Sequence, residues 1–396
     1  QLLAAASIVG RSFDLETARA VSGRSDDEAV EAVEELVRLR LVQEVERPQA
    51  GAEPLYDFSH AKLREVVYDG CGLARRRLLH LRAAEAIVSR PGRRREPEQA
   101  AVVAGHYRSA GREAEAAEWY ARAGAHAASV HAHSDALGHL SSALALGHPD
   151  PASLHERIGD LQTLMGDYAS ALSSYEAAAA FCPPDRVVVI EHRLGAVQER
   201  RGRPDLADGH FRAALEAVGG DDTTRARLLA ERSLAAHRMQ RPDDAADLAR
   251  QAADVAASAG DRLALSQAHN ILGILESRRG HFPQAREHLA RSLDFAGDLD
   301  DPSPRIAALN NLALTERAQG NLEESAKLIR RALDESARQQ DLHRKAALHG
   351  NLADVLHEMG RTDESKQQQL EAVTLFFQIG ERDESAQPGI WKLVEW

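Results

Sequence analysis

The sequence is poor in the residues that usually carry chemistry. It has only two cysteines, Cys71 and Cys182, and they lie too far apart to form a metal or redox motif. Aromatic residues make up 4% of the 396 residues, and no apolar run approaches the ~20 residues of a membrane-spanning helix. Because cysteine is so rare and no span is present, we expect a protein of the reducing cytoplasm.

Catalytic motifs are missing as well. The sequence contains no phosphate-binding loop of the form GxxxxGK[ST], and no serine or cysteine nucleophile lies in a recognisable turn with a histidine partner. Four histidines lie close together, namely His126, His131, His133 and His139. No two of them have the i, i+4 spacing that places two zinc ligands on one helix face. We therefore expect no catalytic residue, no metal site and no cofactor in this chain.

Negative charge is unevenly distributed. Residues 1–100 hold 16 Lys and Arg against 17 Asp and Glu, a net charge of −1, and the rest of the chain holds 33 against 44, a net charge of −11. An acidic surface repels the phosphates of nucleic acids. We do not expect the C-terminal three quarters of the chain to bind DNA or RNA.

A pattern of small and larger apolar residues recurs along most of the chain. In one copy, Gly159 and Gly166 are followed by Ala171 and Tyr175. The position of Gly166, which we take as the turn between two helices, has counterparts along the chain. These turn positions are 166, 202, 240, 280, 320 and 360, with spacings of 36, 38, 40, 40 and 40. Small residues let two helices approach closely, and a glycine past the end of a helix adopts a positive φ at little cost. The pattern predicts about eight helical hairpins between residues 97 and 379.

These marks resemble those of the tetratricopeptide repeat (TPR) family, which reads small, Gly, Ala, aromatic, Ala and Pro. The resemblance covers about 280 residues. The family repeats every 34 residues, so the longer spacing here implies longer helices. The resemblance implies a right-handed superhelix of stacked hairpins, with a concave groove lined by the first helix of each.

The first quarter of the chain predicts a different fold. Residues 1–10, a segment beginning at Phe13, and residues 25–42 have helical patterns, whereas residues 41–47 and 55–60 alternate like strands. Three helices followed by a two-strand wing predict a winged helix, in an otherwise mostly α-helical protein. The third helix carries six acidic residues against two arginines. It would repel DNA, which disfavours the DNA-binding use of this fold.

The other use of a winged helix is as a lid on a nucleotide-binding domain. The helical pattern of residues 1–22, followed by FSHAKLREVVYDG at residues 58–70, resembles the winged-helix segment after the ATPase domain of STAND signal-transduction ATPases. In that family a histidine before a Leu-Leu-Arg helix contacts the phosphate of bound ADP and holds the off-state. The resemblance places a nucleotide-binding domain upstream of Gln1.

The histidine of this motif corresponds to His60. Leu63 and Arg64 match the Leu-Arg that follows in the family, whereas Ser59 and Ala61 replace its Met and Asp. The resemblance implies that His60 senses nucleotide in the full-length protein, with the adjacent helix N-terminus adding positive potential. The alternative is that His60 caps or packs locally.

The groove implied by the repeats contains candidate ligand contacts. Asparagines lie just before the small mark of the predicted first helices: Asn270, Asn310, Asn311 and Asn351. In the TPR family such asparagines can hold the backbone of an extended peptide. Basic residues on the same set of helices are His237, Arg238, Arg278 and Arg317. The alternative is that all of these residues are solvated or bonded within the repeats.

Four parts follow from these patterns: a winged helix at 1–71, a connector at 72–96, repeats at 97–379 and a capping segment at 380–396. The connector is the most basic segment and ends near Arg93–Arg95. It is either a solvated linker or a docking patch for an acidic partner. The last segment contains two tryptophans, which we expect to cover the open end of the last repeat.

Together these resemblances imply the regulatory part of a bacterial STAND-type ATPase. Similar proteins are large activators of the SARP, LuxR or maltose-activator kind, and TPR ATPases linked to nucleotide cyclases. ATP or ADP and Mg²⁺ would bind upstream, while the groove senses a protein, a peptide or a small inducer and the effector drives oligomerisation. The chain would not itself be an enzyme or contact a membrane. The alternative is a TPR scaffold that assembles proteins without a nucleotide switch.

Overall fold

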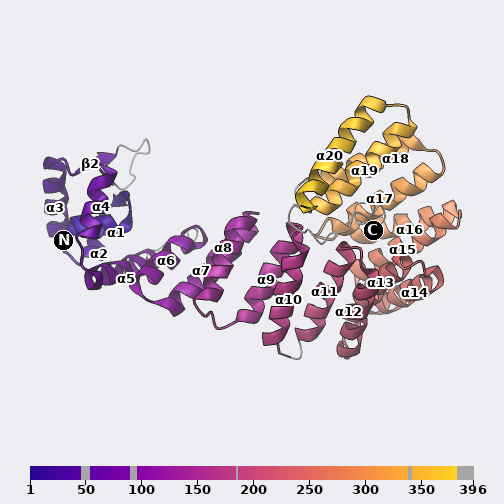
Figure 1. Cartoon of the computed structure of the whole chain (residues 1–396), viewed down its shortest axis with the longest axis horizontal. Helices are drawn as coiled ribbons and strands as arrows, with labels where there is room; N and C mark the ends of the chain where they lie inside the picture. The colour runs from indigo at the N-terminus through magenta and orange to yellow at the C-terminus, as the bar shows by residue number, and fades with distance from the viewer. Residues whose placement is uncertain (46–53, 90–95, 184–185, 338–340, 381–396) are drawn as a thin grey trace. The chain divides into compact units, whose positions relative to one another are not determined.

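The computed structural model of the chain describes residues 1–45, 54–89, 96–183, 186–337 and 341–380. The chain forms two compact units, Gln1–Leu154 and His155–Trp396, and almost all of their regular structure is helical (Figure 1). The predicted turn between the two strands, Arg93–Arg95 and the C-terminal capping segment lie outside the described residues. None of the described helices is long and apolar enough to cross a membrane.

The first unit begins with helices and a small sheet. Its elements are α1 (Leu2–Val9), β1 (Ser12–Asp14), α2 (Leu15–Ser22), α3 (Asp26–Arg38), β2 (Val42–Val45), β3 (Leu55–Phe58) and α4 (Ala61–Asp69). The three strands are antiparallel in the order β1-β3-β2. Helix α3 begins with a capping box, in which the side chains of Ser25 and Glu28 each accept a hydrogen bond from the backbone of the other residue. The acidic residues of α3 are exposed.

One prediction for this region is wrong. The sequence pattern predicts that Phe13 begins the second helix, but Phe13 lies in β1 opposite Tyr56. Its ring is buried and stacks on the Tyr56 ring at a centroid distance of 5.8 Å. Asp14 then caps α2 by accepting a hydrogen bond of 2.7 Å from the Thr17 amide, so the helix begins at Leu15, two residues later than predicted. The sheet therefore has three strands, where the sequence predicts two.

Helices α5 (Leu73–Ser89), α6 (Glu96–Ala110), α7 (Glu113–Ser129) and α8 (His133–Ala145) complete the first unit. Helix α5 includes most of the predicted connector and packs against α1, α2 and α6. It buries Leu79 and Ala83. Helix α7 pairs with both α6 and α8, so one helix serves two adjacent hairpins.

Six antiparallel hairpins follow. They are formed by α9 (Pro151–Leu164), α10 (Tyr168–Phe181), α11 (Val187–Arg200), α12 (Pro204–Ala217), α13 (Asp222–Arg238), α14 (Pro242–Ala259), α15 (Arg262–Arg278), α16 (Phe282–Ala296), α17 (Ser303–Ala318), α18 (Leu322–Ser336), α19 (Leu342–Glu358) and α20 (Thr362–Gly380). All six predicted turn positions have a positive φ, between 60° at Gln240 and 82° at Gly320. The six predicted turns and their hairpins are confirmed, whereas the two further hairpins expected before them share helix α7.

The small residue of each first helix makes room for the large residue of the second. An added Cβ on Gly195 would lie 2.4 Å from Cε1 of Phe211, and one on Gly159 would lie 2.6 Å from Cε1 of Tyr175. Real Cβ atoms do not approach other heavy atoms this closely. The recurring small mark is therefore a packing requirement of the hairpin.

The second unit also folds back on itself. Tyr168 of α10 and Phe376 and Ile379 of α20 belong to one buried cluster. The Tyr168 hydroxyl lies 3.0 Å from Nδ1 of His343, a residue 175 positions later in the chain. Hairpin α9–α10 thus contacts hairpin α19–α20, and the superhelix closes after one turn (Figure 1).

Candidate functional site

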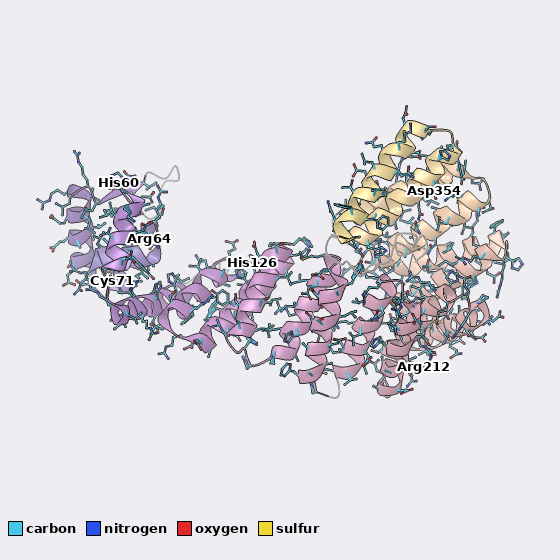
Figure 2. The ribbon with its side chains drawn as sticks, in the orientation of Figure 1. His60, Arg64, Cys71, His126, Arg212 and Asp354 are labelled. Carbon is cyan, nitrogen blue, oxygen red and sulfur yellow. The ribbon has the colours of Figure 1, made fainter. Side chains whose placement is uncertain are left out.

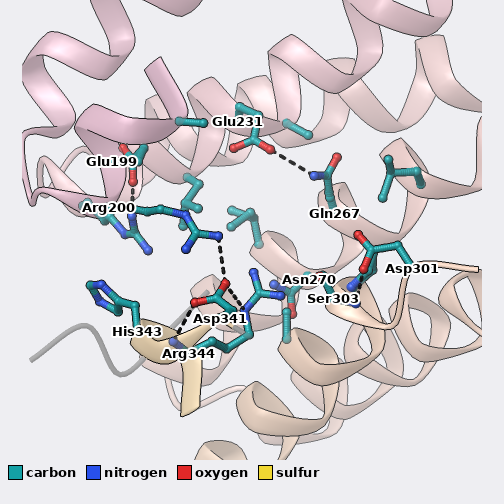
Figure 3. A pocket seen from close by; sticks show the side chains of 18 residues that line it. Glu199, Arg200, Glu231, Gln267, Asn270, Asp301, Ser303, Asp341, His343 and Arg344 are labelled. Carbon is teal, nitrogen blue, oxygen red and sulfur yellow. Dashed lines mark hydrogen bonds and ion pairs between the residues drawn. The ribbon is translucent and has the colours of Figure 1, made fainter. Parts of the chain in front are cut away.

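A cavity of about 290 Å³ opens among the first helices of five successive hairpins. Its walls come from α11, α13, α15, the start of α17 and the start of α19 (Figure 3). Residues three, four or seven positions apart on one helix share a face. Glu231, Leu234 and Arg238 follow this spacing on α13, as Leu263, Gln267 and Asn270 do on α15. The sequence therefore directs these side chains into the cavity once the helices stack.

Asp341 is the central ion-pair acceptor of one wall. Its Oδ2 accepts from Nη2 of Arg200 at 2.9 Å, and its Oδ1 caps α19 by accepting from the Arg344 amide at 3.1 Å. Burial alone would raise the pKa of this carboxyl, but Arg200 and then Arg344 outweigh it and hold the pKa below its usual value. Asp341 therefore stays charged and joins α11 to α19.

The opposite wall is rich in hydrogen-bond acceptors. The Nε2 group of Gln267 donates to Oε1 of Glu231 at 3.0 Å, and Glu199 is ion-paired to Arg238. Burial raises the pKa of both Glu199 and Glu231. Oε1 of Glu199 and Oε1 of Gln267 are buried without a hydrogen-bond partner among the described residues. This wall can accept further hydrogen bonds from a ligand.

His343 borders the same cavity in its neutral form. It contacts Tyr168 and lies edge-on to Phe376 at a centroid distance of 6.0 Å. Burial, followed by the charge of Arg200, lowers the pKa of His343 to about 4. The charge of Asp341 raises this pKa, whereas those of Arg238 and Arg344 lower it further.

We predict that His343 contributes to acid sensitivity. An unfolded histidine titrates near pH 6.5, so between pH 6.5 and pH 4 the unfolded state binds more protons and stability falls as pH falls. At pH 5 this term should cost about 2 kcal/mol relative to neutral pH. Urea unfolding at pH 7.5 and pH 5 should therefore show a smaller acid loss for His343→Gln than for the wild type. An equal loss in both proteins would contradict the prediction.

The structure places the predicted groove asparagines in a buried ladder. Nδ2 of Asn311 donates to Oδ1 of Asn270 at 2.9 Å, and Nδ2 of Asn351 donates to Oδ1 of Asn310 at 2.8 Å. All four are at most 6% exposed. Asn270 also lines the cavity. The ladder joins α15, α17 and α19 at the concave face.

The predicted basic residues are not gathered at one place. Arg238 lines the cavity, and His237 beside it is buried. Arg317 is ion-paired with Asp354 at 3.1 Å and with Glu358 at 2.6 Å, and Arg278 is exposed at the end of α15. Sequence patterns did not single out several residues that line the cavity, namely Glu199, Arg200, Glu231, Gln267, Asp341 and Arg344. The helical spacing from Arg238 and Asn270 could have identified Glu231 and Gln267.

His60 belongs to the first unit, whereas the residues that line the cavity belong to the second. It is the N-cap residue of α4, its side chain makes no capping hydrogen bond, and it is exposed. Arg64 on the next turn, which Figure 2 labels together with His60, donates from Nε to the Ser7 carbonyl at 3.0 Å and so ties α4 to α1. The imidazole of His60 is thus accessible at a helix N-terminus. Among the described residues, no group of three or more His, Cys, Asp or Glu could hold a metal ion.

Residues 305–376 match the tetratricopeptide repeat family model. They comprise most of hairpins α17–α18 and α19–α20, and the preceding hairpins repeat their turn geometry. No curated protein matches the sequence.

Solved structures of similar fold include a Rap protein complexed with competence and sporulation factor. It is 12% identical, with 92% of this chain and 95% of the Rap chain covered at a TM-score of 0.53. Another is a STAND protein with a tetratricopeptide repeat sensor from Pyrococcus horikoshii, 12% identical, with 97% of this chain and 51% of that protein covered at a TM-score of 0.44. At 12% identity the likeness to the Rap protein shows the fold alone, a superhelix of TPR-like hairpins.

Proposed function

We propose that this protein with tetratricopeptide repeats is the sensing part of a STAND-type signalling ATPase of the cytoplasm. Its groove binds a protein, a peptide or an inducer, and its first unit is a winged helix that couples binding to an upstream nucleotide-binding domain. The observation that supports sensing most directly is the cavity at the concave face. Buried charged and amide groups line it, and pockets of this kind bind ligands through a few convergent polar groups.

The order of elements in the first unit supports the winged-helix assignment. Helix, strand, two helices and two further strands occur in sequence, with β2 and β3 as the wing. The exposed acidic face of α3 disfavours phosphate contact by that helix. A role in contacting the protein's own nucleotide-binding domain is compatible with this charge.

His60 provides the test of nucleotide coupling. If its imidazole donates to a phosphate oxygen of ADP, His60→Ala removes a hydrogen bond to a charged group and should speed ADP release from the full-length protein about tenfold. The measurement is stopped-flow displacement of a fluorescent ADP analogue. The matched control is His357→Ala, which removes an exposed histidine of α19 and should leave the rate unchanged.

Release at the wild-type rate from the His60→Ala protein would reject the nucleotide-sensing role. The groove would then serve a TPR scaffold that holds partner proteins together without a switch. The sequence upstream of Gln1 separates the same two functions, because the switch requires a phosphate-binding loop followed by an apolar strand ending in Asp. For the switch, effector binding would shift a closed, ADP-bound state toward an open, oligomerising one.

A further inference from the structure

The acceptor-rich wall of the cavity lacks a cation for one of its carboxylates. Glu231 has a single hydrogen bond, from the neutral amide of Gln267, and no ion pair with any described residue. Its neighbours Glu199 and Gln267 each keep one buried oxygen without a partner among the residues that the structure describes. Glu199 is only 5% exposed. A buried acceptor without a donor is costly, so this wall is suited to a ligand that supplies several N–H donors.

The arginines that line the cavity are paired with carboxylates other than Glu231. Arg200 is bound to Asp341 on the opposite wall, Arg344 lies 4.0 Å from the same carboxylate, and Arg238 is paired with Glu199. Figure 3 shows Glu231 and Gln267 across the cavity from Asp341 and Arg344. The charges of Arg238, Arg200 and Arg344 act on Glu231 at a distance, but in the described part of the chain none of the three arginines forms an ion pair or hydrogen bond with its carboxylate.

Size and apolar lining limit the occupant. A cavity of about 290 Å³ lies at the lower limit of the roughly 300–1,000 Å³ range for small-molecule pockets. It can hold one long side chain but not a folded element. Leu234 and Ile271 line it beside Glu231 and Gln267, and such side chains can pack against the alkyl stem of a long basic residue.

We propose that this cavity binds the arginine or lysine side chain of a peptide lying in the groove, with Glu231 and Gln267 accepting hydrogen bonds from its cationic head. The inference rests on the proposed function only in taking the concave groove as the binding surface. A guanidinium fits best, because its planar array of donors can reach a carboxylate and a neighbouring amide oxygen together. A carboxylate ligand is disfavoured at this wall.

The test compares short blocked peptides that differ only at one central position. Four peptide pools have the same random flanks and carry arginine, lysine, citrulline or norleucine at the central position. The peptides that the whole chain retains are quantified by mass spectrometry. Citrulline keeps the shape of arginine but has no charge. We expect arginine and lysine to be retained about tenfold more strongly than citrulline or norleucine, because a charge-assisted hydrogen bond is lost in the neutral analogues.

Glu231→Gln is the decisive variant. It keeps the side-chain shape and leaves no cation unpaired, because Glu231 has no ion pair in the described part of the chain. In this variant the retention of arginine peptides should fall to about that of the norleucine peptides, and the preference for arginine over citrulline should disappear. The control is Glu287→Gln, which changes the net charge equally at an exposed position of α16. It should keep the wild-type preference, and melting temperatures check that both variants fold.

Two results would overturn the proposal: equal retention of arginine and citrulline peptides by the wild type, or an arginine preference that survives Glu231→Gln. Binding of agmatine as strong as that of the arginine peptides would assign the cavity to a small amine instead of a peptide. The ADP-release experiment does not involve this cavity. A normal rate with His60→Ala together with a loss of preference in Glu231→Gln would leave a scaffold that binds basic peptides.

Discussion

Replacing Asp341 with alanine should lower the free energy of unfolding of the second unit by about 3 kcal/mol. The substitution leaves Arg200, whose side chain is 28% exposed, without the carboxylate to which it is bound. It also removes the N-cap of α19. Breaking a buried ion pair is costly because the remaining charge stays desolvated. Urea unfolding followed by circular dichroism measures the change.

An exposed aspartate provides the matched control. Asp247 is paired with Arg250 on α14, and both side chains are more than 60% exposed. Asp247→Ala should cost less than about 1 kcal/mol, as exposed ion pairs do. If Asp341→Ala destabilised the protein no more than Asp247→Ala, the closure of the superhelix through Arg200 and Asp341 would make no measurable contribution to stability.

Gly195→Ala should also destabilise the protein strongly, although alanine is the better helix former. The added methyl group would overlap the Phe211 ring of α12, whose Cε1 atom lies 2.4 Å from the position of the new Cβ. Phe211 is fully buried, so the ring cannot move aside without displacing its neighbours. Overpacking of this kind costs about 1–3 kcal/mol. The same urea experiment applies.

Gly209→Ala is the paired control for this substitution. Gly209 lies within α12, where an added Cβ meets nothing within 4 Å. Alanine should therefore stabilise the helix by about 0.5–1 kcal/mol. Opposite signs of the change in unfolding free energy for the two substitutions would establish that close helix packing, and not helix propensity, requires a small residue at position 195. A stabilising Gly195→Ala would show that Phe211 can repack.

The repeat was predictable because it depends on local packing. A small residue, a turn residue with positive φ and a larger residue at fixed spacing define each hairpin, and positions 166 to 360 followed that pattern. Phe13 was not predictable from the same reasoning. A segment of three residues has too little periodicity to distinguish a strand from a helix start, and Phe13 enters a strand because Tyr56 and β3 pair with it.

The candidate site, too, was predictable from the sequence only in part. Arg238 and Asn270 were expected at the concave face, and both line the cavity. All four predicted asparagines bond along the ladder, because stacking brings Asn310 beside Asn351 and Asn311 beside Asn270. Such contacts depend on how neighbouring hairpins are rotated against each other. A repeat period by itself does not specify that rotation.

The sequence by itself determined the helical hairpins, their turns and the face of each helix that is apolar, since these follow from contacts within about 40 residues. Only the tertiary structure decided that the second unit closes after one turn. That closure brings Arg200 to Asp341 and Tyr168 to His343. The tertiary structure also decided that Glu231 lines the cavity without an ion pair to any residue that the structure describes. These contacts depend on small rotations between neighbouring hairpins that accumulate along the superhelix. The sequence of a single repeat does not specify those rotations.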